Sequence, residues 1–475
     1  MNYSILRYIL GYVLKIEAAF MLLPCVTSLI YHEEEGRYFF VVACICMLIG
    51  VLMTLHKPKS TTFYLKEGCL ATSLSWILLS LFGAIPFWIS GEIPHWEDAL
   101  FETISGFTTT GATVLGNVEA LSHTALIWRS FTHWIGGVFL LAILPLSGGS
   151  SINLMRAESP GPSVGKLVPK VRYTAMILYT IYFGMTVIEF IFLLAGHMPL
   201  FDALTTAFGT AGTGGFALNS AGIAGYGSPA IEIVLGIFMI LFGINFNTYF
   251  LLLLRKFKEA LTSEETAVYF GVIGVSVVAI SINILSCFSN TGEAVRSAFF
   301  QVASIITTTG FATVDFNLWP EFSKHLIVLL MIIGACAGST GGGLKISRVI
   351  ILFKSFIAEI KQILNPKEVV SIRLNGKNVD KKTLNSTRIY FGAYVILICI
   401  FTLIISLDGL DLTTNLTAVL SCFNNIGPGL NLVGPMENFG LYSDWVKVVL
   451  SLAMLTGRLE IFPMFLLFAK SAHDR

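Results

Sequence analysis

Four short glycine turns carry the chemistry that this sequence offers. They read Thr108-Thr109-Thr110-Gly111, Gly212-Thr213-Gly214-Gly215, Thr307-Thr308-Thr309-Gly310 and Asn424-Asn425-Ile426-Gly427. The backbone carbonyls of such a turn can replace the water around a bare cation, and glycine adopts strained backbone at the lowest cost. Four such turns in one chain predict a pore that is built by internal repetition rather than by four subunits.

The candidate cation ligands are the residues of these turns, through their main-chain oxygens. They are Thr109, Thr110, Gly111, Gly212, Thr213, Gly214, Gly215, Thr308, Thr309, Gly310, Asn424, Asn425, Ile426 and Gly427. The second turn holds an additional glycine, but aligning Gly215-Phe216 with Gly310-Phe311 favours Gly215 as the equivalent residue. Close helix packing, the usual role of glycine in membrane spans, fits these turns poorly because each is flanked by Thr or Asn.

The composition places these turns in a membrane protein. Of 475 residues, 55% are hydrophobic and only 12% are charged, with a mean hydropathy of +0.78. A soluble domain carries roughly 25% charged residues. Apolar runs of about 20 residues recur, and each is long enough to cross a bilayer. The sequence therefore predicts an all-α polytopic membrane protein.

The net charge of +1 hides a strong asymmetry. Lysine and arginine cluster in the stretches 57–66, 156–172, 255–258, 345–388 and 470–475, while the segments with the glycine turns hold almost none. The positive-inside rule predicts that the basic loops are cytoplasmic and that the turns face outside. Membrane topology thus explains the basic clusters without a nucleic-acid partner.

Other kinds of site have little support in the sequence. The 8 cysteines are scattered, mostly in apolar spans, and their spacing suggests neither zinc nor an iron–sulfur cluster. No glycine-rich loop lies between a predicted strand and a helix, so we expect no nucleotide on this chain.

The chain is predicted to consist of two leading spans and four repeated units. The predicted boundaries are 1–60 for the leading spans and 61–165, 166–262, 263–370 and 371–475 for the pore units. Each unit consists of a span, a short helix, a turn and a second span. The predicted spans are 5–30, 38–56, 66–90, 125–147, 173–195, 229–254, 267–288, 325–355, 388–407 and 444–469.

A short helix is predicted before each turn, at 97–108, 200–209, 293–306 and 411–423. Helices of this length cannot cross a bilayer, and backbone that is not helical at membrane depth must be buried or line a wet cavity. Each short helix begins with acid, which suits capping and the helix dipole; the acids are Glu97, Asp98, Asp202, Glu293 and Asp411. The negative C-terminal ends then point toward the turns and favour a cation there.

The span 325–355 is interrupted near its middle by a loop rich in glycine. The run Gly338-Ser339-Thr340-Gly341-Gly342-Gly343 cannot remain helical without cost. In a pore protein, such a break indicates a gate; a passive kink packed on neighbouring helices is the alternative. Arg458 lies inside the last span, where a charge is costly and usually faces a cavity or a partner.

Several longer motifs resemble the TrkH/KtrB/HKT superfamily of potassium transporters over essentially the whole chain, and its TrkH branch in particular. The two additional N-terminal spans fit that branch better than the shorter KtrB. The motifs are the stretch 101–114, Trp128-Arg129-Ser130, Trp134-Ile135-Gly136-Gly137, the run 338–345, Asn424-Asn425-Ile426-Gly427-Pro428-Gly429 and Thr456-Gly457-Arg458-Leu459-Glu460. The chain departs from the pattern after Gly137, where the span is about one helical turn shorter than in such relatives.

The resemblance implies a potassium uptake pore in a bacterial inner membrane, selective for K⁺ and Rb⁺ over Na⁺. Because the four turns differ in sequence, we expect weaker discrimination than a symmetric filter gives. The likeness places the loop 338–343 just below the filter and Arg458 beside it, as parts of a gate. Lys345 is either a second barrier or a plain inward-facing charge.

The resemblance further implies a homodimer with two pores and a cytosolic ring of nucleotide-binding subunits of the TrkA type. The stretches 354–388 and 147–172 are the expected docking surfaces for that ring. A Na⁺- or H⁺-coupled symporter of the same fold is the alternative. A membrane-embedded enzyme would need an acid partner for His133 and Ser130, and an amino-acid transporter would show two broken spans in inverted repeats.

Overall fold

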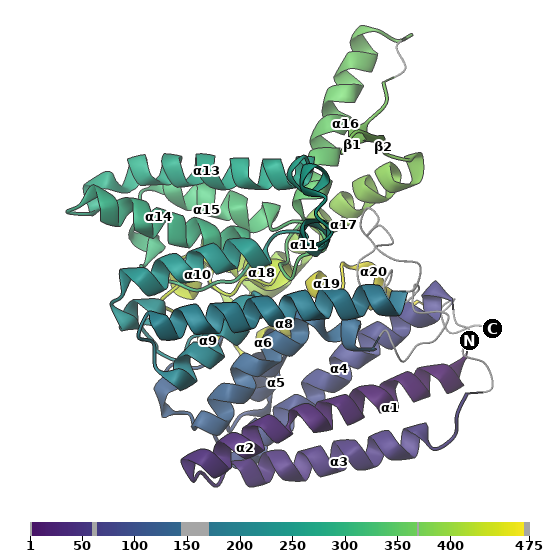
Figure 1. The fold of residues 1–475 in the computed structure, drawn as a ribbon, viewed down its shortest axis with the longest axis vertical. Helices are drawn as coiled ribbons and strands as arrows, with labels where there is room; N and C mark the ends of the chain where they lie inside the picture. Colours follow the sequence, from purple (N-terminus) through teal and green to yellow (C-terminus); the bar gives the residue numbers. More distant parts are fainter. Residues whose placement is uncertain (1, 59–63, 144–170, 368–369, 470–475) are drawn as a thin grey trace.

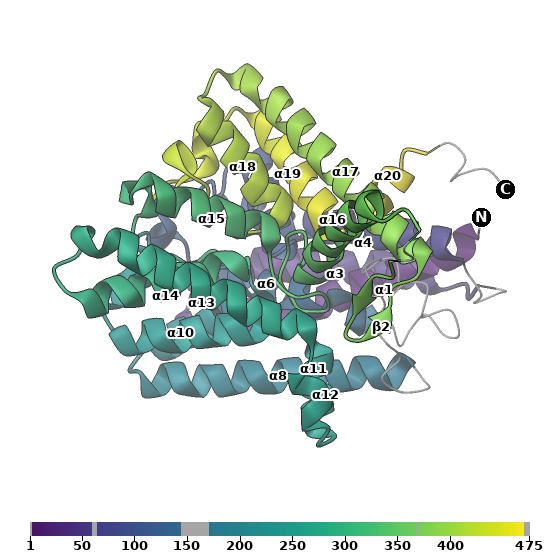
Figure 2. The ribbon, with the colours of Figure 1, turned by 90° about the horizontal axis from the view of Figure 1, so that it is seen from above.

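The computed structural model describes residues 2–58, 64–143, 171–367 and 370–469. Long helices lie side by side in one bundle (Figure 1). Seen from above, α8 and α10 lie at one side of the bundle and α17 to α19 at the other (Figure 2). The predicted all-α membrane class is confirmed. Of the expected docking loop 147–172, residues 147–170 lie outside the described part.

The leading part of the chain folds as three helices. α1 (Tyr3–Phe20) and α2 (Leu22–Tyr31) form one bent span, and α3 (Gly36–Thr54) returns beside α1. A Cβ on Gly50 would collide with the carbonyl oxygen of Gly11. Bare glycines therefore let α1 and α3 approach closely, as small residues do in membranes.

The remaining helices follow the predicted order of spans and short helices. Their bounds are α4 (Leu65–Ser90), α5 (Trp96–Phe107), α6 (His123–Ile143), α8 (Val171–Ala195), α9 (Leu200–Gly212), α10 (Pro229–Phe242), α11 (Phe246–Leu253), α12 (Phe257–Leu261), α13 (Glu264–Ile284), α14 (Thr291–Ile306), α15 (Glu321–Ile333), α16 (Ile346–Leu364), α17 (Lys381–Ile405), α18 (Leu412–Asn424), α19 (Asp444–Arg458) and α20 (Phe462–Leu466).

The second span of three units is broken, which corrects the continuous spans predicted at 229–254 and 444–469. Six described helical segments are long and apolar enough to cross a membrane, and α10 with α11 counts as a seventh although it bends by 89°. The freed backbone at this bend is satisfied by the glycine-rich loop, since Cys336 N donates to Gly243 O at 3.1 Å and Phe246 N to Gly338 O at 3.0 Å. The last span ends its helix at Arg458 and resumes at Phe462.

A small antiparallel hairpin interrupts the otherwise helical chain. It pairs β1 (Arg373–Leu374) with β2 (Lys377–Asn378). Asn375 and Gly376 connect the strands with φ of 51° and 74°, which is the asparagine–glycine pattern of a tight hairpin turn. The hairpin lies beside α16, which leaves the bundle (Figure 1).

The four short helices before the turns are α5, α9, α14 and α18, and side chains cap the N-termini of α14 and α18. Asp411 Oδ2 accepts from Thr414 N at 3.0 Å, and Asn290 Oδ1 accepts from Gly292 N at 2.9 Å. The other predicted acids lie in the first turns of α5, α9 and α14. In this position they satisfy or offset the positive helix start.

The start of α6 is held by a carboxylate from the loop between α2 and α3. Glu33 accepts hydrogen bonds from His123 N at 2.8 Å and Thr124 N at 2.9 Å, and also from the Thr124 hydroxyl. Partial burial opposes ionisation, but the bonds from Thr124 and His123 outweigh it and lower the pKa of the Glu33 carboxyl. The stabilisation is therefore complete at neutral pH and is lost as the pH falls through this lowered pKa.

Replacing Glu33 with Gln is expected to lower the stability of the detergent-solubilised chain by about 1 kcal/mol at neutral pH, the scale of a helix cap. In acid, where the parent carboxyl is protonated, the deficit should disappear. Thermal unfolding at both pH values measures it. Glu34→Gln is the control, because Glu34 is exposed and, within the described residues, its ion pair is with exposed Arg37. A deficit that persists unchanged in acid would refute the ionic contribution.

Candidate functional site

The four glycine turns meet and close into a ring in chain order. A Cβ on Gly111 would collide with the carbonyl oxygen of Gly214, one on Gly215 with Thr309 O, and one on Gly310 with Ile426 O. A Cβ on Gly427 would lie 3.0 Å from Thr110 O, which returns the sequence of contacts to the first turn. We call this arrangement the carbonyl ring; it consists of Thr110-Gly111, Gly214-Gly215, Thr309-Gly310 and Ile426-Gly427.

One backbone conformation is used four times to build the ring. The residues two before the ring glycines have left-handed φ between 55° and 58°. Their N–H groups bond back three residues and the next N–H groups bond back five, a pattern that ends helices with a left-handed residue. Three of these residues are threonines, whose branched side chain makes a left-handed φ costly by roughly 1–3 kcal/mol; the four are Thr109, Thr213, Thr308 and Asn425.

Because the four turns share one backbone conformation, the structure identifies which glycine of the second turn belongs to the ring. Gly215 has a φ of 71° and faces the third turn, as Gly111 faces the second. Gly212 ends helix α9, and a Cβ there would collide with the carbonyl of His133. Gly212 and Asn424 are thus the last residues of their helices and lie outside the ring.

The side-chain oxygens of the turns are engaged within the protein. Thr108 and Thr110 share a hydroxyl–hydroxyl bond of 2.8 Å, and Thr307 and Thr309 share an identical one. Asn425 Nδ2 donates to Thr110 Oγ1 at 2.9 Å, so a side chain also links the fourth turn to the first. The main-chain carbonyls are then the oxygens that the ring can offer to a ligand.

Two side chains of α6 connect the first turn to the second. Arg129 Nε lies 2.5 Å from Glu102 Oε1, and both side chains are almost fully buried. The same guanidinium donates to Ala217 O at 2.9 Å and lies 3.7 Å from the Phe216 ring centroid. Glu102 also accepts from Val114 N at 3.1 Å, just beyond the first ring glycine. This buried ion pair therefore holds the segments that follow the first and second ring glycines, at Val114 and Ala217.

His133 forms the second connection between these turns. Its Nδ1 lies 2.8 Å from Gly106 O, and its Nε2 lies 3.3 Å from Phe216 N. Because a carbonyl only accepts and an amide N–H only donates, the ring must be neutral with the proton on Nδ1. His133 therefore links the two turns, donating from Nδ1 to the first and accepting at Nε2 from the second. Glu102, the acid on the neighbouring helix, pairs with Arg129 rather than with His133 or Ser130.

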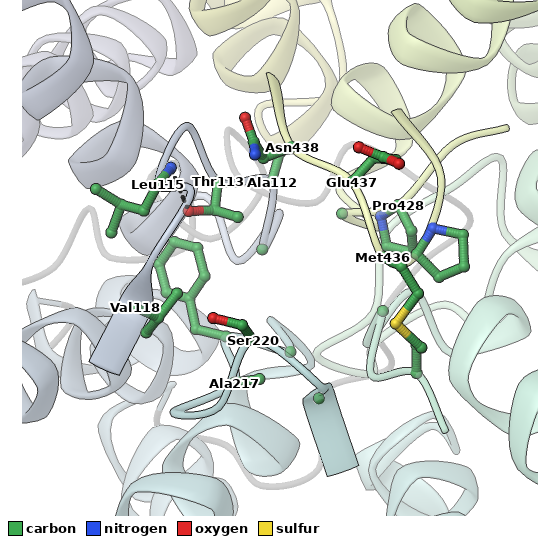
Figure 3. A pocket seen from close by; sticks show the side chains of 18 of the residues that line it. Ala112, Thr113, Leu115, Val118, Ala217, Ser220, Pro428, Met436, Glu437 and Asn438 are labelled. Atoms are coloured by element: carbon green, nitrogen blue, oxygen red, sulfur yellow. Dashed lines mark hydrogen bonds between the residues drawn. The ribbon is translucent and has the colours of Figure 1, made fainter. Parts of the chain in front are cut away.

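A cavity of about 130 Å³ opens on the side of the ring where the chain leaves the four ring glycines. The four ring glycines form its floor, and Figure 3 shows the surrounding side chains around an open centre. Thr113, Leu115 and Ser220 lie on one side, and Met436 and the exposed carboxylate of Glu437 lie on the other. A solvated cation reaching this cavity would meet the ring directly.

The glycine-rich loop, residues 338–343, covers the opposite side of the ring, where the short helices end. Gly342 N donates to Thr308 Oγ1 at 2.7 Å. A Cβ on Gly341 would approach Thr307 O, and one on Gly342 would collide with Asn424 O. Gly341 and Gly342 thus pack against the third and fourth turns without side chains between them.

The two ends of the loop are fixed to other helices. Gly338 faces Asn245 at the α10–α11 bend, and Ser339 Oγ donates to Cys336 O at 2.7 Å. A Cβ on Gly343 would instead collide with the backbone of Gly334. The carboxylate of Glu265 in α13 accepts from Ala337 N at 2.7 Å. Only the middle of the loop therefore touches the turns.

Arg458 joins the loop to the first turn. Its guanidinium donates to Thr340 O at 3.0 Å, to Thr109 Oγ1 at 3.1 Å and to Gly136 O at 2.6 Å. The ammonium of Lys345 bonds to the carbonyl of Gly341 in the same loop. Two positive side chains therefore bind carbonyls of the loop on the side of the ring that the loop covers. Arg458 binds Thr340 O, and Lys345 binds Gly341 O.

Glu460 is a partner of a different arginine. It forms a buried ion pair with Arg348 of α16, whose guanidinium lies 4.2 Å from the Tyr390 ring centroid. The Glu460 carboxylate is thus committed to Arg348, and it lies beyond the last helical residue of α19, Arg458. Within the described residues, no cluster of His, Cys, Asp and Glu could hold a metal ion.

The structure thus presents a ring of backbone carbonyls, covered at one end by a glycine-rich loop, inside a bundle with helices long and apolar enough to cross a membrane. The family model described as "TrkH: Cation transport protein" matches residues 36–272 and 283–474. The chain belongs to this family.

Individual relatives match over nearly the whole chain. The Trk system potassium uptake protein TrkH of Escherichia coli strain K12 is 35% identical, with 98% of this chain and 99% of that protein covered. TrkG, a Trk system potassium uptake protein of the same strain, is 32% identical with 98% and 97% covered. The crystal structure of the potassium transporter TrkH from Vibrio parahaemolyticus matches with a TM-score of 0.91 at 28% identity, covering 100% of both chains.

Breaking the buried pair of Arg129 and Glu102 from one side is expected to cost about 3–5 kcal/mol, because the remaining charge loses its partner. Glu102→Gln and Arg129→Met test each side, and the double variant should lose much less than the sum. Unfolding in detergent measures all four members of the cycle. The exposed pair of Arg37 and Glu34 is the control, with coupling below about 1 kcal/mol. Additive losses at the buried pair would contradict this assignment.

Proposed function

We propose that this chain takes up K⁺ through a gated pore in the inner membrane of a bacterial cell. The observation that carries the proposal is the closed ring of backbone carbonyls formed by four equivalent turns. Carbonyl rings of this kind replace the hydration shell of K⁺. The names of the relatives, which are potassium uptake proteins, support the same ion.

The proposed filter is the carbonyl ring, with K⁺ and Rb⁺ as its ions. Each ring glycine is backed by the carbonyl of the next turn, so the size of the ring depends on all four turns together. The turns nevertheless differ, with threonine before the first and third ring glycines, glycine before the second and isoleucine before the fourth. This inequality supports a modest preference over Na⁺.

The proposed gate consists of the loop 338–343 with Arg458 and Lys345. Gly341 and Gly342 pack directly against two turns, and this packing supports a loop that closes the path from the ring. Glycines leave room for the loop to move, while Arg458 and Lys345 hold it through hydrogen bonds that movement would break. A positive charge at this point also opposes a cation while the loop is in place.

Partners and coupling extend the proposal. A homodimer and a cytosolic nucleotide-binding ring of the TrkA type are proposed, with the basic stretch 354–388 as one docking surface.

The four-unit division at 61–165, 166–262, 263–370 and 371–475 is proposed too, and the shared backbone of the four turns supports it. Coupled symport with Na⁺ or H⁺ is the alternative, and K⁺ flux under an imposed Na⁺ or pH gradient at clamped potential distinguishes the two.

Gly310→Ser is expected to raise Na⁺ flux relative to K⁺ flux in liposomes. The added side chain would collide with Ile426 O at a backbone φ of 86°, so the ring must deform. If displacing the Ile426 carbonyl weakens K⁺ relative to Na⁺ by about 1.4 kcal/mol, the relative flux changes about tenfold. Gly409→Ser is the matched control, with a φ of 82° and nothing within 4 Å of the added Cβ. An unchanged flux ratio in the Gly310 variant would count against this filter.

Arg458→Ala is expected to raise resting Rb⁺ flux from liposomes that contain the chain alone, because the bond to the loop carbonyl of Thr340 is lost together with the bonds to Thr109 and Gly136 that anchor it. Arg458→Lys should be intermediate, since it keeps the charge but cannot make all three bonds. Tracer efflux before and after adding valinomycin gives the fraction released through the chain. Equal resting flux in parent and Ala variant would remove Arg458 from the gate.

A further inference from the structure

Helix α16 carries apolar side chains that the described chain leaves uncovered. Phe353 is 66% exposed, Phe356 63% and Ile363 73%. The helix leaves the bundle (Figure 1), and a cavity of about 750 Å³ lies between it, the first turns of α13 and the segment before β1. This volume falls within the range of small-molecule sites.

The cavity has apolar walls and a basic rim. Val268, Ile350, Ile357 and Ile372 are among its wall residues, while Lys361 and Arg373 lie at its edge. The walls suit hydrocarbon, and the rim suits an anion.

Within the described residues, no ion pair neutralises the two basic side chains of the rim, Lys361 and Arg373. Lys354 forms an ion pair with Glu264, and its amine also donates to Arg373 O at 2.8 Å. Among the described residues, no ion pair includes Lys361 or Arg373. Arg373 Nε donates to Asn378 Oδ1 at 3.1 Å, which holds the guanidinium in place. The complement of this site is therefore a ligand with one anionic group and a long apolar part.

The position of the cavity fits the depth of a lipid headgroup. α13 crosses the membrane by length and composition, and it begins at Glu264. Val268 lies one turn further along this helix, on the hydrocarbon side of the rim. The basic residues of 345–388 assign this end to the cytoplasmic leaflet, where basic pockets between helices bind anionic headgroups.

We propose that this cavity binds an anionic phospholipid of the cytoplasmic leaflet. Its phosphate would lie between Lys361 and Arg373, and an acyl chain would follow Ile350 and Ile357 of α16. Dissolved phosphate lacks the part that fills the apolar walls, and a zwitterionic lipid cancels the charge that the rim attracts.

The test uses the full chain in detergent, titrated with phosphatidylglycerol or phosphatidylcholine and measured by native mass spectrometry. The double variant Lys361→Gln/Arg373→Gln should bind phosphatidylglycerol about thirtyfold more weakly, since each basic residue near a membrane surface contributes about fivefold. Its phosphatidylcholine binding should be unchanged. Lys381→Gln/Lys382→Gln is the matched control, because it removes two exposed lysines of α17 that do not line the cavity.

Three results would overturn the proposal. Equal phosphatidylglycerol binding in the double variant and the parent would remove the site. Displacement by inorganic phosphate at equal concentration would make it a site for a free anion. Loss of a dimer peak without loss of bound lipid would make the α16 face an interface between copies. Because the readout is lipid mass and not ion flux, none of these results bears on potassium uptake.

Discussion

The structure depends on the direct contact between each ring glycine and a carbonyl of the next turn. A side chain at Gly111, Gly215 or Gly310 would push the neighbouring carbonyl away, so three of the four junctions have no room to adjust locally. The short helices must then deliver their C-terminal ends to one point, and the surrounding spans must hold them there. The left-handed threonines are strained for the same reason, and they persist because the packing around them fixes the backbone.

Charge inside the bundle follows from this requirement for rigidity. Glu102 with Arg129 and Glu460 with Arg348 are buried pairs that involve helices from different parts of the chain. Arg458 donates to Thr340 O in the loop, to Thr109 Oγ1 in the first turn and to Gly136 O in α6. These bonds join the proposed gate to the scaffold that the buried pairs hold.

Much of this arrangement could be predicted from the sequence, and the exceptions share a cause. Apolar runs gave the class of fold, and the four turns gave the segments that meet in the ring. Six of the candidate residues precede the ring, and they are Thr109, Gly212, Thr213, Thr308, Asn424 and Asn425. The bend at Gly243 was not predictable from hydropathy, because the bonds that stabilise it come from Cys336 and Gly338, far along the chain. The partners of Arg129 and Glu265 were missed for the same reason. A charge in an apolar stretch signals that a partner exists, but only the folded chain shows which residue it is.

The ring closes through residues that are distant in the chain, since Gly427 meets Thr110 and Asn425 bonds the same threonine. During synthesis, the first three turns are complete long before the fourth emerges from the ribosome. Until then the ring lacks the contacts that Ile426 O and Gly427 make with Gly310 and Thr110. The complete ring is therefore a property of the whole chain, and it can form only after the last of the four turns has been made.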